Sequence, residues 1–227
     1  MKISVSLAPG PRTVEYALHA ESLGYDRIWV YDSPALYWDC WPTLAHVASH
    51  TKRIGLGVGA IIPGLRHVMV TAASAIAIER LAPGRLALAV GTGFTGRLLL
   101  GKRPHAWRVV EDYVRTLRKL LAREDVEIDG ALLRSLHGQE MGLAGGAAIP
   151  ILVAANGPKG LAVAKAAGDG VMSIAGPRPG FSWSAYAVQG TVLLSGERYS
   201  DPQVMEPARS CDRPAVSRRL RVRRSSR

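Results

Sequence analysis

The run Arg85-Leu-Ala-Leu-Ala-Val-Gly-Thr-Gly-Phe-Thr-Gly-Arg97 predicts a strand that passes directly into a glycine-rich turn. Glycines, hydroxyls and an arginine beyond a strand end suit an anionic ligand, because bare backbone N–H groups can surround it. The turn lacks the Gly-Lys-Ser/Thr ending of a Walker loop. This stretch therefore predicts a binding edge rather than a nucleotide P-loop.

The same strand-and-helix unit recurs on both sides of this run. Apolar strand patterns begin at residues 2, 27, 54 and 85, at intervals of 25, 27 and 31 residues. Each interval is the length of a strand, a helix and two loops, which is typical of βα repeats that feed a parallel sheet. Beyond a predicted helix over 106–123 and a hairpin insertion near 128–131, further strands are predicted at 149–154, 170–174 and 190–194.

The predicted fold class is α/β, and two architectures fit the repeat. A doubly wound sheet and a (β/α)8 TIM barrel both contain such units, but seven strands in order without GxGxxG after the first favour the barrel. No apolar eighth strand follows Leu194, so the barrel is expected to be incomplete. We predict a barrel domain over 1–210 and a basic, disordered tail over 211–227, which resembles an out-of-frame C-terminus.

Composition excludes several function classes. The 227 residues are 48% hydrophobic and 21% charged, which argues against disorder, and no apolar stretch reaches the length of a membrane span. Seven arginines and one aspartate give residues 211–227 a net +6 of the total +11. That tail holds no aromatic residue to stack on bases, so no specific nucleic-acid partner is predicted. Two cysteines without a disulfide or metal spacing, and no signal peptide, predict a cytoplasmic protein.

Candidate site residues follow the strand ends, where parallel barrels place their sites. Asp32 follows the second strand and suits either ligand binding or a turn with Ser33. Alternate glycines at 55–59 expose bare backbone, for a flat ligand or for close packing inside the barrel. Asn156 precedes a helix N-terminus that can cradle phosphate, although it equally suits a plain N-cap. The histidines show no metal spacing and no G-x-S-x-G elbow occurs, so no metal site and no hydrolase are predicted.

Together these segments resemble the luciferase-like monooxygenase superfamily. The resemblance rests on 31–37, 53–57, 81–85, 90–97 and 154–161, with further matches at 168–170 and 189–193, and spans roughly residues 1 to 209. The most specific segments are Val-Gly-Thr-Gly-Phe-Thr-Gly-Arg97 and Ala-Ala-Asn-Gly-Pro-Lys-Gly-Leu161. The chain is most similar to the branch that uses coenzyme F420, the methylenetetrahydromethanopterin reductase-like oxidoreductases.

The resemblance implies hydride transfer between coenzyme F420, or alternatively FMN, and a small organic substrate. It implies a bulge with a non-prolyl cis bond between Gly59 and Ala60 that supports the cofactor ring. It also implies that the cofactor phosphate lies against two segments, whose residues here are Thr92, Gly93, Arg97, Asn156, Gly157 and Gly160. A homodimer is expected because relatives commonly form one.

Two departures from the family pattern affect the predicted activity. Several relatives have a histidine after the strand-two aspartate, where this chain has Ser33. The catalytic candidates are therefore Tyr31 and Asp32, with Asp39 as a weaker substitute. The family barrel is usually longer than this chain, which keeps open an alternative: a non-catalytic, truncated remnant that folds only as an oligomer.

Overall fold

The computed structural model describes residues 1–134, 146–188, 196, 198, 200 and 202. The chain separates after Tyr186 into two units, and the first, Met1–Tyr186, carries the fold. Its described residues form one sheet of seven parallel strands. These are β1 (Ser4–Leu7), β2 (Arg27–Val30), β3 (Gly55–Ile61), β4 (Leu86–Val90), β7 (Ile151–Ala154), β8 (Gly170–Ser173) and β9 (Ser184–Tyr186).

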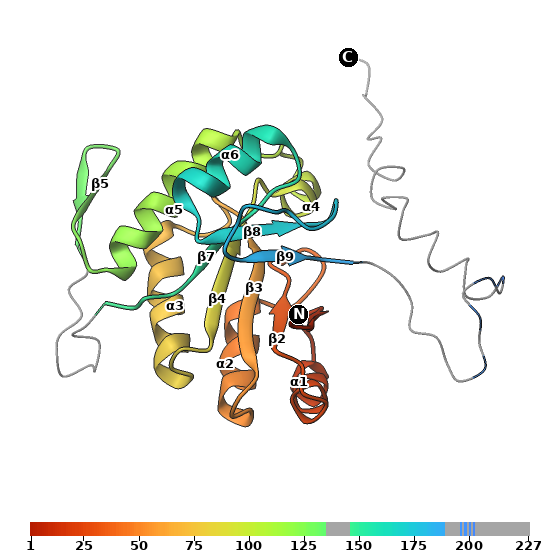
Figure 1. Ribbon diagram of the computed structural model, residues 1–227. Helices are drawn as coiled ribbons and strands as arrows, with labels where there is room; N and C mark the ends of the chain where they lie inside the picture. Colours follow the sequence, from red (N-terminus) through yellow and green to blue (C-terminus); the bar gives the residue numbers. More distant parts are fainter. Residues whose placement is uncertain (135–145, 189–195, 197, 199, 201, 203–227) are drawn as a thin grey trace, which may run out of the picture. The chain divides into compact units, whose positions relative to one another are not determined.

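Helices follow most of these strands and lie along the outside of the curled sheet (Figure 1). Those described are α1 (Thr13–Ser22), α2 (Cys40–His50), α3 (Val68–Leu81), α4 (Phe94–Leu99), α5 (Trp107–Leu121) and α6 (Pro158–Ala167). The strand order is β1-β2-β3-β4-β7-β8-β9, so the sheet always grows in one direction. A doubly wound sheet reverses its order at a switch point, and this one does not. The prediction of an incomplete (β/α)8-type barrel is confirmed as a curled half-barrel.

Successive residues of the strands face opposite sides of the sheet and meet different neighbours. Ile28 and Val30 are fully buried in the main core, which the helices cover. Trp29, between them, packs on the concave side with Ala87 and Leu152. Full burial of an aliphatic side chain contributes about 1.5–3 kcal/mol, so the helix-facing layer supplies most of the stability. The concave side, with its small residues, is where a ligand can approach the backbone.

The predicted hairpin insertion is confirmed after α5. Strands β5 (Val126–Ile128) and β6 (Ala131–Leu133) pair antiparallel and form a separate two-stranded sheet. Asp129 and Gly130 join them with positive φ angles of 51° and 77°. Two left-handed central residues define the type I′ turn, whose twist matches that of paired strands.

Two elements differ from the sequence prediction. Residues 94–99 form α4, where a loop was expected, and β9 at Ser184–Tyr186 was not predicted. The strand predicted at 190–194 and the domain boundary and tail predicted from 210 onward lie outside the described residues. None of the described helices is both long and apolar enough to cross a membrane.

Candidate functional site

The carboxyl ends of the parallel strands meet at one edge of the half-barrel, as the topology requires. Three groups of predicted site residues gather at this edge. The segment after β2 begins with Tyr31 and Asp32, the turn after β4 spans 91–97, and the segment after β7 spans 155–160. The sequence prediction of a site at the strand ends therefore corresponds to a single edge of the molecule.

A bulge in β3 lies at the centre of this edge. The peptide bond between Gly59 and Ala60 is cis, as the family resemblance implied. Gly59 pairs with Ala89 and Ile61 with Val90, so Ala60 is the extra residue. A Cβ placed on Gly91 would lie 3.3 Å from the Cβ atoms of both Ala60 and Ala154. Small residues of three neighbouring strands thus form a surface on which a flat ring can lie against backbone.

Larger side chains fill the barrel beneath this surface. A Cβ on Gly57 would lie 2.3 Å from the Trp29 ring, so glycine at 57 is required by packing. A Cβ on Gly59 would lie 3.2 Å from both the Trp29 ring and Met172 Cε. Of the two interpretations of the alternate glycines, close packing therefore holds for Gly57. Trp29 and Met172 form the floor under the Gly59–Ala60 bulge.

Packing also explains the glycines of the turn after β4. Gly93 is left-handed, with a φ of 81°, and its Cβ would lie 2.4 Å from Ile62 Cγ2. A Cβ on Gly96 would lie 2.5 Å from Ile62 Cδ1. The two glycines allow α4 to pack directly against Ile62, the residue that follows β3. Gly93 is buried, whereas Thr92 is half-buried.

Arg97 is held within its own loop. Its Nε donates to the Arg103 carbonyl at 2.7 Å, and one terminal nitrogen lies 2.8 Å from His105 Nε2. His105 Nε2 is also 2.7 Å from the Pro63 carbonyl, and its backbone N–H donates to the Thr92 carbonyl at 2.9 Å. The side chain remains partly exposed, so its charge still faces solvent near the strand ends.

The segment after β7 places its predicted residues in different environments. Asn156 Oδ1 accepts from the Ile174 N–H at 2.9 Å and from Ser173 Oγ at 3.1 Å, so this side chain joins the ends of β7 and β8. Gly157 is the N-cap of α6, with no side-chain cap, and open space surrounds its α-carbon. Gly160 is buried, since its Cβ would lie 2.5 Å from the Trp107 ring.

Arg178 is a residue that the sequence interpretation missed. It donates to the Asn156 carbonyl at 2.9 Å and to Ser173 Oγ at 3.3 Å. These contacts bring a guanidinium beside the open N-terminus of α6, where the helix dipole already favours negative charge. The available signal was a lone arginine in Gly176-Pro-Arg-Pro-Gly180, directly after the sixth predicted strand.

The side chains of Asp32 and Tyr31 lie on opposite faces of the sheet. Asp32 is buried against Arg66, which also bonds Asp39 at 2.7 Å. Burial raises the pKa of the Cys40 thiol, and the negative charge of Asp32 raises it further. Tyr31 instead lies beside Ser6 of the neighbouring strand β1, and burial raises the Tyr31 pKa more than the Ser6 hydroxyl lowers it. Asp32 is thus directed at the helical layer, whereas Tyr31 is half-buried at the strand edge.

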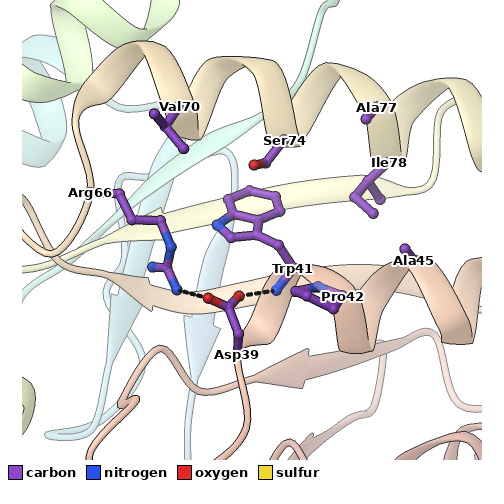
Figure 2. A pocket seen from close by; sticks show the side chains of 9 residues that line it. All are labelled: Asp39, Trp41, Pro42, Ala45, Arg66, Val70, Ser74, Ala77 and Ile78. Carbon is purple, nitrogen blue, oxygen red and sulfur yellow. Dashed lines mark hydrogen bonds and ion pairs between the residues drawn. The ribbon is translucent and has the colours of Figure 1, made fainter.

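Two cavities lie outside the three groups of site residues named above. A groove of about 380 Å³ runs between α2 and α3, with Asp39 and Arg66 at one end and Trp41 along its wall (Figure 2). A second cavity of about 550 Å³ lies near the amino ends of β7 and β8, beside Arg118 and Trp183. In the described part of the chain, no three His, Cys, Asp or Glu side chains gather as a metal site.

The curled parallel sheet, its bulged third strand and the open edge define an α/β half-barrel of the TIM-barrel type with a strand-end site. Comparison with known proteins assigns its family. The sequence profile of the luciferase-like monooxygenase family matches residues 4–209, and the chain belongs to that family.

Two curated relatives and two solved structures illustrate the similarity. The chain is 30% identical over 168 residues to a 5,10-methylenetetrahydromethanopterin reductase of Methanolobus tindarius, covering 72% of this chain and 50% of the relative. It is 32% identical over 188 residues to an F420-dependent glucose-6-phosphate dehydrogenase of Kineococcus radiotolerans, covering 74% of this chain and 53% of the relative.

The fold comparison agrees with the sequence comparison. The coenzyme F420-dependent tetrahydromethanopterin reductase of Methanopyrus kandleri matches with a TM-score of 0.62 at 20% identity, covering 76% of this chain and 55% of that chain. A second match is the oxygenating constituent of 3,6-diketocamphane monooxygenase of Pseudomonas putida, in complex with FMN. Its TM-score is 0.59 at 18% identity, and the match covers 76% of this chain and 57% of that chain. The chain spans about half the length of the curated relatives it matches.

Proposed function

We propose that this chain is an oxidoreductase that transfers a hydride between coenzyme F420 and a small organic substrate, with FMN as the alternative cofactor. The observation that carries the proposal is the β3 bulge at Ala60, which lies beside Gly91 and Ala154. Family membership supports it, and so does the name of the Kineococcus relative, which specifies F420. FMN is retained because the Pseudomonas putida structure is a complex with FMN.

The residues present fit a flat ring with an anionic tail. The ring, when bound, supplies the hydride chemistry, and the protein supplies position and electrostatics. Backbone at Gly59, Ala60 and Gly91 would support its face. Thr92 and Gly93 continue this surface beyond β4.

The phosphate would lie at the N-terminus of α6, where Gly157 leaves the backbone open. Asn156 holds the segment in place, and Arg178 adds a positive charge. Arg97 contributes its partly exposed charge from the other side of the edge. Gly160 has a packing role under Trp107, so we assign it to shaping the helix start rather than to direct contact.

Tyr31 is our choice for the residue that holds a proton near the reacting carbon. Burial raises the pKa of Tyr31 above its ordinary value, so its Oη keeps the proton at neutral pH. Asp32, paired with Arg66, is better suited to positioning this segment than to proton transfer.

A fluorescence titration of the purified chain with coenzyme F420, and in parallel with FMN, tests the proposal. We expect saturable binding of one cofactor and loss of that binding in Gly91→Val, whose branched side chain would press against Ala60 and Ala154 and distort the surface proposed for the ring. Ala131→Val, on the exposed hairpin strand β6, is the control, because strands accept valine readily. A folded wild-type chain that binds neither cofactor would contradict the proposal.

A second candidate is a non-catalytic remnant that folds only as an oligomer. It is favoured by one observation: the sheet of the described residues ends in two edges, β1 and β9. Exposed edges are normally covered or paired. Turnover with reduced cofactor would exclude the remnant, and sedimentation velocity would test the proposed homodimer, which stays a prediction.

A further inference from the structure

We propose that the substrate meeting the cofactor at this edge is an apolar ring compound rather than a carbohydrate or a sugar phosphate. The inference rests on the proposed function and specifies its substrate class. Its basis is a set of exposed apolar side chains at the strand ends: Trp38 is 60% exposed, Phe94 57% and Ile174 64%. Exposed apolar side chains on the loops around a binding site are available to contact an apolar ligand.

The three side chains come from three different loops of the same edge. Trp38 follows β2, and its backbone N–H donates to the Pro9 carbonyl beyond β1 at 3.2 Å. Phe94 is the first residue of α4, directly after the turn at Gly93. Ile174 follows β8 and is fixed by its N–H bond to Asn156 Oδ1. The parallel topology places all three at the edge that holds the Gly59–Ala60 bulge.

The two acids and Arg97 in these loops already have partners. Asp32 and Asp39, the acids of the segment after β2, both pair with Arg66. Arg97 is engaged with His105 and with a backbone carbonyl. A sugar needs free hydrogen-bonding groups for its hydroxyls, and a buried hydroxyl without a partner weakens binding.

Exposed basic residues near the edge suit a different role, and one of them, Lys159, lies in the first turn of α6. Lys102 and Arg103 lie in the loop behind α4. That loop returns to the edge through the His105 N–H bond to the Thr92 carbonyl, on the side where the cofactor's anionic tail is proposed. Their charge therefore favours the cofactor tail and disfavours a cationic substrate.

Isothermal titration calorimetry on the cofactor-loaded chain tests the inference, with menadione as the apolar probe and glucose 6-phosphate as the carbohydrate probe. We expect menadione to bind at least about tenfold more tightly. Phe94→Gln and Trp38→Gln should each weaken menadione binding by about tenfold. Leu132→Gln is the matched control, because Leu132 is equally exposed, at 64%, on the hairpin strand β6.

Three outcomes would overturn the inference. Preference for glucose 6-phosphate would do so, as would unchanged menadione binding in both edge variants. A shift from dimer to monomer in Trp38→Gln, with menadione binding intact, would make the patch a protein interface instead. Cofactor titration of the same samples distinguishes failure of the substrate inference from failure of the proposed function. Cofactor binding without the menadione preference rejects only the substrate class, whereas no cofactor binding rejects the proposed function together with it.

Discussion

Arg66 donates from one guanidinium nitrogen to both carboxylate oxygens of Asp32, at 2.7 and 2.8 Å. The Asp32 side chain is 1% exposed and that of Arg66 is 15% exposed. The second terminal nitrogen of Arg66 reaches Asp39, whose other oxygen accepts from the Trp41 N–H and caps α2. One arginine thus joins the ends of β2 and β3 to the start of α2.

This network predicts a large stability loss for Arg66→Met. Removing the arginine leaves the Asp32 carboxylate buried and unpaired, which costs roughly 3–5 kcal/mol in the free energy of unfolding. The control is Arg134→Met, which breaks the exposed, solvent-screened pair with Asp125 and should change the stability far less. Urea unfolding monitored by circular dichroism measures both. Equal losses in the two variants would mean that the buried pair contributes no more than a surface one.

The contacts of Glu21 predict that the fold loses stability in acid. Burial raises the Glu21 pKa, but backbone N–H bonds from Ile54, Arg53 and Lys52 outweigh it, so the folded-state pKa lies below the ordinary value of 4.5. A depressed carboxyl pKa stabilises the fold above the unfolded-state pKa, and this contribution is lost as pH falls through the folded pKa. Glu21→Gln should therefore lose less stability than wild type as the pH falls below about 4.5.

Unfolding free energies between pH 3 and 7 test this. Glu15 provides an internal comparison, because its pKa is also lowered, by the exposed Arg12 side chain. High salt should remove the Glu15 contribution and leave that of Glu21, whose partners are backbone groups. Identical pH profiles for wild type and Glu21→Gln would contradict the assignment.

Tyr31→Phe should lower turnover by about 10²-fold if its hydroxyl holds the proton, as general acids typically contribute. Cofactor affinity should stay unchanged, because only one oxygen is removed. Since the Tyr31 pKa is raised above its ordinary value of 10, wild-type turnover should show no loss attributable to its ionisation at or below about pH 9. Steady-state kinetics and a cofactor titration check this, and unchanged turnover would remove Tyr31 from proton transfer.

Arg178→Met should weaken cofactor binding about tenfold, as charge-assisted contacts with phosphate are strong. Arg97→Ala should also weaken binding, most clearly at low salt. Riboflavin, which lacks the phosphate, is the control ligand, and Arg115→Met on the outer surface of α5 is the control variant. Fluorescence titration at two salt concentrations measures the effects. An equal loss of riboflavin affinity would place Arg178 outside the phosphate site.

The sequence predicted the repeating architecture well because each βα unit is local. Strand and helix patterns lie within about 30 residues, and the helix predicted over 106–123 contains α5 at Trp107–Leu121. The cis bond at Gly59–Ala60 was implied by family resemblance and is present. The turn of the hairpin followed from Asp129-Gly130, whose residue types favour left-handed backbone.

Long-range contacts account for what the sequence did not predict. Glycines at 93 and 96 indicated a loop, but they are required where α4 packs on Ile62. Arg66 meets Asp32 across 34 positions and Arg178 meets Asn156 across 22, and spacing alone cannot pair such residues. The predicted contact role of Gly160 could not be separated from packing without knowing that Trp107 lies above it. The cytoplasmic location, the dimer and the individual site roles stay predictions.

The sequential strand order has a consequence for synthesis on the ribosome. Every strand of the main sheet docks on the strand made before it, so each βα unit can be added as it emerges. Pairing never has to wait for a distant segment, which keeps the entropic cost of loop closure small at each step. The growing sheet therefore has two open edges at any moment, β1 and its newest strand, and the loops at the carboxyl ends of the strands are added one at a time as translation proceeds.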